Sequence, residues 1–244
     1  LKVISRCGTG MDNVDRAYAA EKGIEVRNTP DGPTLAVAEL TLGLILTLLR
    51  QVPHQDRELR SGVWKKRMGN LLHGKNVGIV GFGKIGQAVA HLLEPFGVNV
   101  GYHDPFADVP GYTRLELDDL MGWADVITLH CPKTENGAPL LDLGRLSLMR
   151  PGSIILNIAR GGLIDEKALL GLLTAGHLAG AALDCFTKEP YDGPLKEMDN
   201  VILTPHMAFY SDTALFDCLR IACQNLTYYL NGEHDKVNRF VPRE

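Results

Sequence analysis

Apolar residues follow two alternating patterns along most of the chain. From residue 76 onward, short runs rich in Val, Ile and Leu are separated by segments with helical spacing of apolar residues. The short runs do not alternate with polar residues, which is typical of parallel strands that are buried on both faces. Strands that alternate with helices in this way predict βαβ units and a parallel sheet. The expected strands are 76–80, 98–102, 125–130, 153–158, 179–183 and 201–203, and the expected helices are 85–96, 117–123, 141–149 and 166–175.

The first 74 residues and the tail follow a looser pattern. Residues 34–50 are apolar on nearly every face, which predicts a helix buried between larger units. The two short strands and one short helix before it cannot enclose a core, so they must pack on another part of the chain. The remaining expected elements are strands at 2–5 and 24–27, helices at 13–22, 54–62 and 211–230, and an arm and linker over 62–74.

Composition narrows the class of protein. The 244 residues are 45% hydrophobic and 22% charged, as in ordinary globular proteins, and this excludes wholesale disorder. The net charge is −4 and no long basic run occurs, so we expect no nucleic-acid partner. The longest apolar stretch, residues 35–49, is short for a bilayer span, so we expect no membrane association. The five cysteines form no CxxC pair, which predicts reduced thiols, no metal site and a cytoplasmic location.

A glycine-rich segment directly follows the strand expected at 76–80. Gly81, Gly83 and Gly86 form a GxGxxG pattern between that strand and a helix, which is the context of a dinucleotide-binding loop. Gly81 would permit the tight turn, Gly83 would let a pyrophosphate approach the backbone, and Gly86 would allow close helix–strand packing. Exposed N–H groups and the helix dipole favour an anion at this place.

Asp104 supplies the second element of such a site. It ends the next strand, 18 positions after Gly86. A carboxylate there accepts hydrogen bonds from ribose hydroxyls and repels a 2′-phosphate, so the sequence predicts NAD rather than NADP. The alternative is a glycine turn beside an unrelated surface aspartate, and the register of the two elements argues against it.

Three further polar segments follow strand ends, and they contain Arg160, Asp184 with Glu189, and His206. In a doubly wound sheet, ligands bind outside the carboxyl ends of the strands, so these residues can converge. Each by itself has an ordinary explanation as a loop ion pair, a cap or a partly buried polar group. Their joint occurrence behind a nucleotide loop favours a catalytic site.

The chemistry of these residues suits hydride transfer coupled to proton transfer. His206 can give a proton to a carbonyl oxygen because imidazole titrates near neutrality. Glu189 beside the ring would stabilise its protonated form. Arg160 can polarise the carbonyl and bind a substrate carboxylate through its fork of donors. The hydride itself would belong to the cofactor.

With these motifs the sequence resembles the D-isomer-specific 2-hydroxyacid dehydrogenases over nearly its whole length. Residues 6–10 and 61–64 are most similar to the 3-phosphoglycerate dehydrogenase branch. The motifs that carry the family resemblance are residues 8–15, 28–30 and 37–39, the glycine loop, the segment around Arg160, Glu189-Pro190 and Pro205-His206.

The resemblance implies NAD as the cofactor, a small 2-hydroxy or 2-oxo acid as the substrate, and Arg160, Glu189 and His206 as the catalytic set. The candidate substrates are 3-phosphoglycerate and glycerate or hydroxypyruvate. Backbone N–H groups near Thr9 and Gly10 would hold the substrate carboxylate. The residues implied to line the cofactor are Phe82, Lys84, Ile85, Pro132, Ala159, Asp184 and Ala208, with Asp184 facing the nicotinamide carboxamide.

The resemblance also implies how the chain is organised. We expect an α/β protein with a Rossmann-type doubly wound parallel sheet and a second, discontinuous and truncated flavodoxin-like substrate lobe. The expected parts are a partial substrate lobe with a long connecting helix and a dimerisation arm over 1–74, the NAD-binding domain over 75–209, and a helix returning to the substrate lobe over 210–244. Family members form homodimers, so the arm around Trp64 would reach the partner, with local packing of Trp64 as the alternative.

Two departures from the family pattern stand out. Family members begin earlier, with further strand–helix units of the substrate lobe, and we expect no appended regulatory domain after the tail. Gly137 occupies a position where the family commonly carries Thr. Two other functions fit the same fold: an NAD(H)-sensing binding protein without turnover, and a formate dehydrogenase-like enzyme, against which the pairing of Glu189 with His206 argues.

Overall fold

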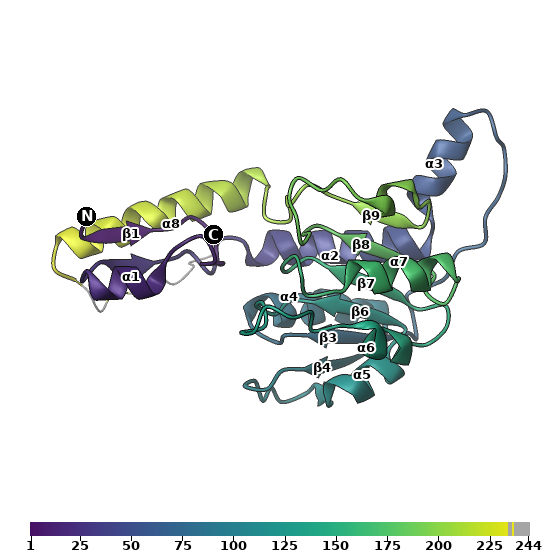
Figure 1. Ribbon diagram of the computed structural model, residues 1–244, viewed down its shortest axis with the longest axis horizontal. Helices are drawn as coiled ribbons and strands as arrows, with labels where there is room; N and C mark the ends of the chain where they lie inside the picture. The colour runs from purple at the N-terminus through teal and green to yellow at the C-terminus, as the bar shows by residue number, and fades with distance from the viewer. Residues whose placement is uncertain (234–235, 237–244) are drawn as a thin grey trace. The chain divides into compact units, whose positions relative to one another are not determined.

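The computed structural model describes residues 1–233 and 236, and the chain divides into two compact units (Figure 1). One unit comprises Leu1–Val37 with Ala208–Glu244, and the other comprises Ala38–Met207. The boundary near residue 37 falls inside a helix, so residues 38–74, which we expected in the first lobe, go with the larger unit. The last residues of the expected 210–244 segment lie outside the described part of the chain.

The larger unit contains a seven-stranded sheet in which every pair of neighbours is parallel. The order is β5-β4-β3-β6-β7-β8-β9, which confirms the doubly wound sheet expected from the sequence. The strands are β3 (Asn76–Val80), β4 (Asn99–His103), β5 (Thr113–Arg114), β6 (Val126–Leu129), β7 (Ile154–Asn157), β8 (Gly180–Leu183) and β9 (Val201–Leu203).

The direction of winding reverses at β3. This strand pairs with β4 on one side and with β6 on the other, although β6 comes later in the chain. Such a reversal opens a crevice at the carboxyl ends of the two strands, which is where ligands of open α/β sheets bind. The glycine loop follows β3 directly and therefore lies at this crevice.

Helices lie on both faces of the sheet (Figure 1). Every residue of β6, β7 and β8 is buried, which explains why their sequences do not alternate. Leu120, Leu146 and Leu169, one from each of α5, α6 and α7, belong to the buried core cluster that covers one face. The connecting helices are α4 (Lys84–Leu93), the short 3₁₀ helix η1 (Glu94–Phe96), α5 (Leu117–Trp123), α6 (Leu143–Leu148) and α7 (Glu166–Thr174).

Helix α2 (Thr34–Leu49) is not buried on every side, contrary to the expectation from its composition. Ala38, Ile45 and Leu49 are buried, whereas the Leu35 side chain is 55% exposed. An apolar residue on a helix can remain at the surface without a large cost, so composition overstated the burial. No single helix of the described residues is long and apolar enough to span a membrane; α2 with α3 (Val52–Arg60), bent by 61°, passes by length and composition only.

The smaller unit is built from both ends of the chain. Strands β1 (Val3–Ser5) and β2 (Glu25–Arg27) form a parallel pair, connected through α1 (Arg16–Glu21), and α8 (Asp212–Leu230) packs on β1. The Ser5 hydroxyl donates to the Ala222 carbonyl at 3.0 Å, and the Asn225 amide donates to the Asn28 carbonyl at 3.1 Å. The tail helix thus supplies the packing partner that the first strands lack.

Two short elements escape the sequence pattern. Both residues of β5 are exposed, and two exposed residues carry no apolar signal. The 3₁₀ helix η2 (Pro194–Glu197) buries only Leu195.

Candidate active site

The glycine loop has the geometry that its pattern predicts. Gly81 has φ +90°, and a Cβ there would lie 2.7 Å from the backbone of His130, at the end of the neighbouring strand β6. A Cβ on Gly86 would lie 2.2 Å from the Gly81 carbonyl oxygen, so only glycine lets α4 start this close to β3. A Cβ on Gly83 would meet nothing within 4 Å, so the space in front of this residue is open.

The residues between these glycines have different surroundings. Phe82 is fully buried and its ring stacks on Tyr102 with centroids 4.0 Å apart, so its side chain belongs to the core. Lys84 and Ile85 open α4, with Lys84 exposed and Ile85 half-buried. Open space in front of Gly83 at the N-terminus of α4 fits a pyrophosphate, because a helix N-terminus stabilises an anion.

The Asp104 carboxylate links the end of β4 to the glycine loop through hydrogen bonds. One oxygen accepts the Phe82 N–H at 2.7 Å, and the other accepts the N–H groups of Phe106 and Ala107 at 2.8 and 3.0 Å. Burial raises the pKa of the Asp104 carboxyl, but these three hydrogen bonds outweigh burial, and the net pKa is below its usual value. The side chain is half-buried at the strand end that the sequence indicated.

His206 and Glu189 form a hydrogen-bonded pair. The Nδ1 atom of His206 lies 2.9 Å from Oε2 and 3.1 Å from Oε1 of Glu189. Glu189 Oε1 also accepts the Phe186 N–H at 3.0 Å, which fixes the carboxylate. Burial raises the pKa of the Glu189 carboxyl, but its bonds to His206 and Phe186 outweigh burial and lower it overall. A fixed carboxylate on Nδ1 leaves Nε2 as the ring atom that can meet a substrate.

Asp184 lies beneath the turn that carries His206. Its Oδ1 atom accepts the Thr204 hydroxyl at 2.6 Å and the Met207 N–H at 2.8 Å, so it joins the residues on both sides of His206. His206 itself has φ 52°, in the left-handed region that non-glycine residues seldom adopt. Asp184 is fully buried, and its carboxylate helps to position this turn. The sequence did not predict this contact.

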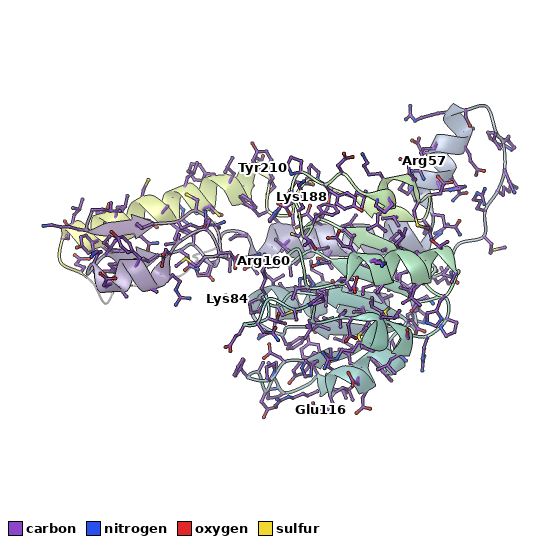
Figure 2. All side chains as sticks on the ribbon, viewed as in Figure 1. Arg57, Lys84, Glu116, Arg160, Lys188 and Tyr210 are labelled. Carbon is purple, nitrogen blue, oxygen red and sulfur yellow. The ribbon has the colours of Figure 1, made fainter. Side chains whose placement is uncertain are left out.

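Arg160 occupies a loop that is pressed against the loop leading to Glu189. A Cβ on Gly161 would lie only 1.7 Å from the Phe186 carbonyl oxygen, so the two loops meet backbone to backbone. The Asn157 amide donates to the Arg160 carbonyl at 2.8 Å, and Arg160 Nη1 donates to the Ala159 carbonyl at 2.7 Å. Figure 2 labels Arg160 at the same end of the sheet as Lys84.

Cys185 lies between these groups. Its Sγ atom lies 3.5 Å from the Ala159 carbonyl oxygen, and it is within 4.8 Å of ligand atoms of both Glu189 and His206. The residue is 2% exposed. Burial, with the carboxylates of Asp184 and Glu189, raises the pKa of the Cys185 thiol to about 12. A thiol with so high a pKa is protonated at neutral pH and is a poor nucleophile.

A pocket of about 570 Å³ adjoins the His206–Glu189 pair. Five of its nine lining residues are apolar or aromatic, so the pair stands at the edge of a partly open, largely apolar hollow. Its lining residues are Phe186, Glu189, Pro190, Tyr191, Lys196, Leu203, Thr204, Pro205 and His206.

The other site residues indicated by the sequence are distributed over both units. Pro132 is exposed after β6 and Ala159 is buried after β7, both in the larger unit. Thr9, Gly10 and Ala208 belong to the smaller unit. There the Asn28 amide donates to the Thr9 carbonyl at 2.8 Å, which ties the loop of Thr9 to the segment that follows β2.

Comparison with known proteins identifies the family. Residues 42–208 match the family described as "D-isomer specific 2-hydroxyacid dehydrogenase, NAD binding domain". The chain is 41% identical to D-3-phosphoglycerate dehydrogenase of Methanocaldococcus jannaschii over 242 residues, which is 96% of this chain and 46% of that protein. It is 43% identical over 215 residues to the protein of the same name from Mycobacterium tuberculosis, covering 85% of this chain and 41% of that one.

Solved structures with a similar fold are found as well. The TT0316 protein from Thermus thermophilus is 40% identical, with a TM-score of 0.90, over 95% of this chain and 76% of that one. D-Lactate dehydrogenase from Aquifex aeolicus, solved with NAD and lactic acid, is 28% identical, with a TM-score of 0.88, over 96% of this chain and 78% of that one.

The chain belongs to the D-isomer-specific 2-hydroxyacid dehydrogenase family, and its larger unit contains the family's NAD-binding domain. The expected resemblance is confirmed, including the similarity to 3-phosphoglycerate dehydrogenases. The chain spans less than half the length of these curated relatives.

Proposed function

We propose that the protein is an NAD-dependent oxidoreductase that interconverts a D-2-hydroxy acid and its 2-oxo acid. The observation that carries this proposal is the His206–Glu189 pair, 2.9 Å apart, in the unit that contains the glycine loop. A nucleotide loop together with a carboxylate-backed imidazole supplies the two functions that carbonyl reduction needs, cofactor binding and proton transfer. The similarity to D-3-phosphoglycerate dehydrogenases supports a phosphoglycerate-like acid as substrate.

In this mechanism the chain binds, orients and moves a proton. The Gly83 region and the first turn of α4 would hold the pyrophosphate of NAD, and Asp104 would accept bonds from the adenosine ribose. Pro132, Ala159 and Asp184 would line the cofactor in the larger unit, and Ala208, in the smaller unit, remains a candidate from the family resemblance. Bound NADH supplies the hydride.

Arg160 would bind the substrate carboxylate and polarise the carbonyl, because its planar fork matches a carboxylate. Thr9 and Gly10, in the smaller unit, remain candidates for backbone N–H donors to a substrate carboxylate, as the family resemblance implies. His206 would donate the proton to the carbonyl oxygen from Nε2, while Glu189 holds Nδ1 and stabilises the charged ring. Asp184 would keep His206 in this orientation through Thr204 and Met207.

A panel assay tests this function. Purified protein is mixed with NADH and separate 2-oxo acids, including hydroxypyruvate and 3-phosphohydroxypyruvate, and NADH oxidation is followed. We expect at least one acid to be reduced to its D-hydroxy product. Tight NADH binding without turnover of any acid would contradict this function and indicate an NADH-sensing protein.

We also propose a homodimer in the cytoplasm. The arm after α3 exposes Trp64 by 84%, Met68 by 90% and Leu71 by 71%, a group of large apolar side chains that a second subunit would cover. Arg67 anchors this arm to α3 through two bonds to Glu58, at 2.6 and 2.7 Å. The five free cysteines support a reducing compartment. Light scattering should give twice the chain mass, and Trp64→Ala with Met68→Ala should lower it.

A further inference from the structure

Three residues from the segments that follow β8 and β9 bring metal-ligand atoms together at the proposed catalytic pair. Cys185 follows β8, Glu189 lies four residues later, and His206 follows β9. One ligand atom from each, the thiol sulfur, a carboxylate oxygen and a ring nitrogen, lies within 4.8 Å of the other two. We propose that these three residues form a binding site for Zn²⁺, and that zinc bound there blocks catalysis.

The ligand set matches the preference of zinc. Zn²⁺ binds thiolate sulfur, imidazole nitrogen and carboxylate oxygen, usually in a tetrahedron. Two nitrogen or oxygen ligands of one tetrahedral zinc are about 3.3 Å apart, given metal–ligand bonds of about 2.0 Å. His206 Nδ1 and Glu189 Oε2 are already 2.9 Å apart, so a small separation of the pair admits the ion. Hard cations such as Mg²⁺ prefer all-oxygen sites and would not use the thiol.

The surroundings leave room for a fourth ligand and keep the sulfur available. The pocket of about 570 Å³ borders both Glu189 and His206, so water or a substrate carboxylate can complete the tetrahedron. The Cys185 thiol makes a weak contact of 3.5 Å to the Ala159 carbonyl, which costs little to give up. Two carboxylates, Asp184 and Glu189, and two cations, Arg160 and Lys133, act on this sulfur, so the ligand set rather than net charge carries the site.

Zinc binding exchanges protons for the metal without any redox change. The Cys185 thiol releases its proton to solvent as the Zn–S bond forms. Nδ1 must be free of its proton for the Zn–N bond to form: a doubly protonated ring releases that proton to solvent, and a neutral ring with its proton on Nδ1 loses it to solvent and takes one up on Nε2, with no net release. The ring is then held with its only proton on Nε2 and without the carboxylate that stabilises imidazolium. It can no longer cycle a proton, so carbonyl reduction stops.

The inhibition rests on the proposed function, whereas the metal site does not, and the tests separate the two. Co²⁺ replaces Zn²⁺ in the purified protein as a spectroscopic probe, and absorption is recorded without substrate. We expect a thiolate-to-cobalt charge-transfer band and the intense visible bands of tetrahedral cobalt. Cys185→Ser should abolish the charge-transfer band, whereas Cys223→Ser, an exposed cysteine on α8, should retain it. No band in the unaltered protein, or an unchanged band in Cys185→Ser, would overturn the site.

A second variant keeps the test valid if Cys185→Ser fails to fold. Activity measurements with added zinc test the inhibition. Glu189→Gln changes a partly exposed ligand by one atom and should weaken zinc binding by at least about 100-fold, since even residues that only support metal ligands cost 10–100-fold. Cys185→Ala should retain its zinc-free rate and need at least about 100-fold more zinc for half-inhibition. Equal zinc sensitivity of Cys185→Ala would overturn the inhibitory role. A cobalt band in a protein without turnover would sustain the metal site and contradict the proposed function.

Discussion

Asp184 is bonded to the residues on both sides of His206. One buried carboxylate oxygen accepts the Thr204 hydroxyl and the Met207 N–H, and between them the His206 backbone has φ 52°. Non-glycine residues held in this region cost free energy and persist only where the surroundings fix them. The imidazole is therefore placed by a buried contact on its backbone side and by Glu189 on its ring side.

Asp184→Ala should release this turn. The Thr204 hydroxyl and the Met207 N–H would lose their shared acceptor, which should lower the free energy of unfolding by about 1–3 kcal/mol. Urea unfolding measures the loss, with Thr204→Val as the control that removes one of the two bonds. An unchanged unfolding midpoint in Asp184→Ala would show that other contacts hold the turn.

Gly161→Ala should disrupt the meeting of two site loops. Its Cβ would overlap the Phe186 carbonyl oxygen at 1.7 Å, and backbone atoms on both sides must move. Gly171→Ala is the matched control, because a Cβ in that helical position meets nothing within 4 Å. Thermal unfolding should show a large loss for Gly161→Ala and a gain of about 0.5–1 kcal/mol for Gly171→Ala. Equal stability of the two variants would contradict the described loop packing.

Asp104→Ala should relax the choice between NADH and NADPH. The carboxylate repels a 2′-phosphate, so its removal should raise the affinity for NADPH relative to NADH. Fluorescence titration with each cofactor measures the ratio. The same ratio before and after the change would remove Asp104 from the ribose site.

The same carboxylate should make stability depend on pH. The pKa of Asp104 is lower in the folded protein than its usual 3.8 because three backbone N–H groups bond to the ionised form, outweighing burial. The ionised carboxylate therefore contributes its full share of the folding free energy above about pH 4. That share is lost as the pH falls through the lower pKa of the folded protein. Urea unfolding measures the free energy of unfolding from about pH 5 to about pH 2, the range in which this carboxyl titrates. In Asp104→Asn that free energy should fall less with pH than in the unaltered protein. An identical pH slope would contradict this assignment.

The sequence predicted the sheet because its strands carry unbroken apolar runs, and it placed Gly81, Gly86 and Asp104 because their spacing follows from one βαβ unit. It could not give what depends on contacts between distant segments. Nothing near Gly161 in sequence shows that Phe186 will press on it. Cys185 lies 21 positions before His206, so only the fold brings its sulfur to the pair. For Asp184 the sequence indicated a strand end, and the contact to the His206 turn required the structure.

We propose that His206, backed by Glu189, transfers the proton that accompanies hydride transfer from NADH to a 2-oxo acid. The most direct measurement compares the reduction rate and the NADH dissociation constant of the unaltered protein with those of His206→Ala. We expect a rate about 10²–10⁴-fold lower in His206→Ala, typical for loss of a general acid, with NADH affinity nearly unchanged. An unaltered rate in His206→Ala would contradict it.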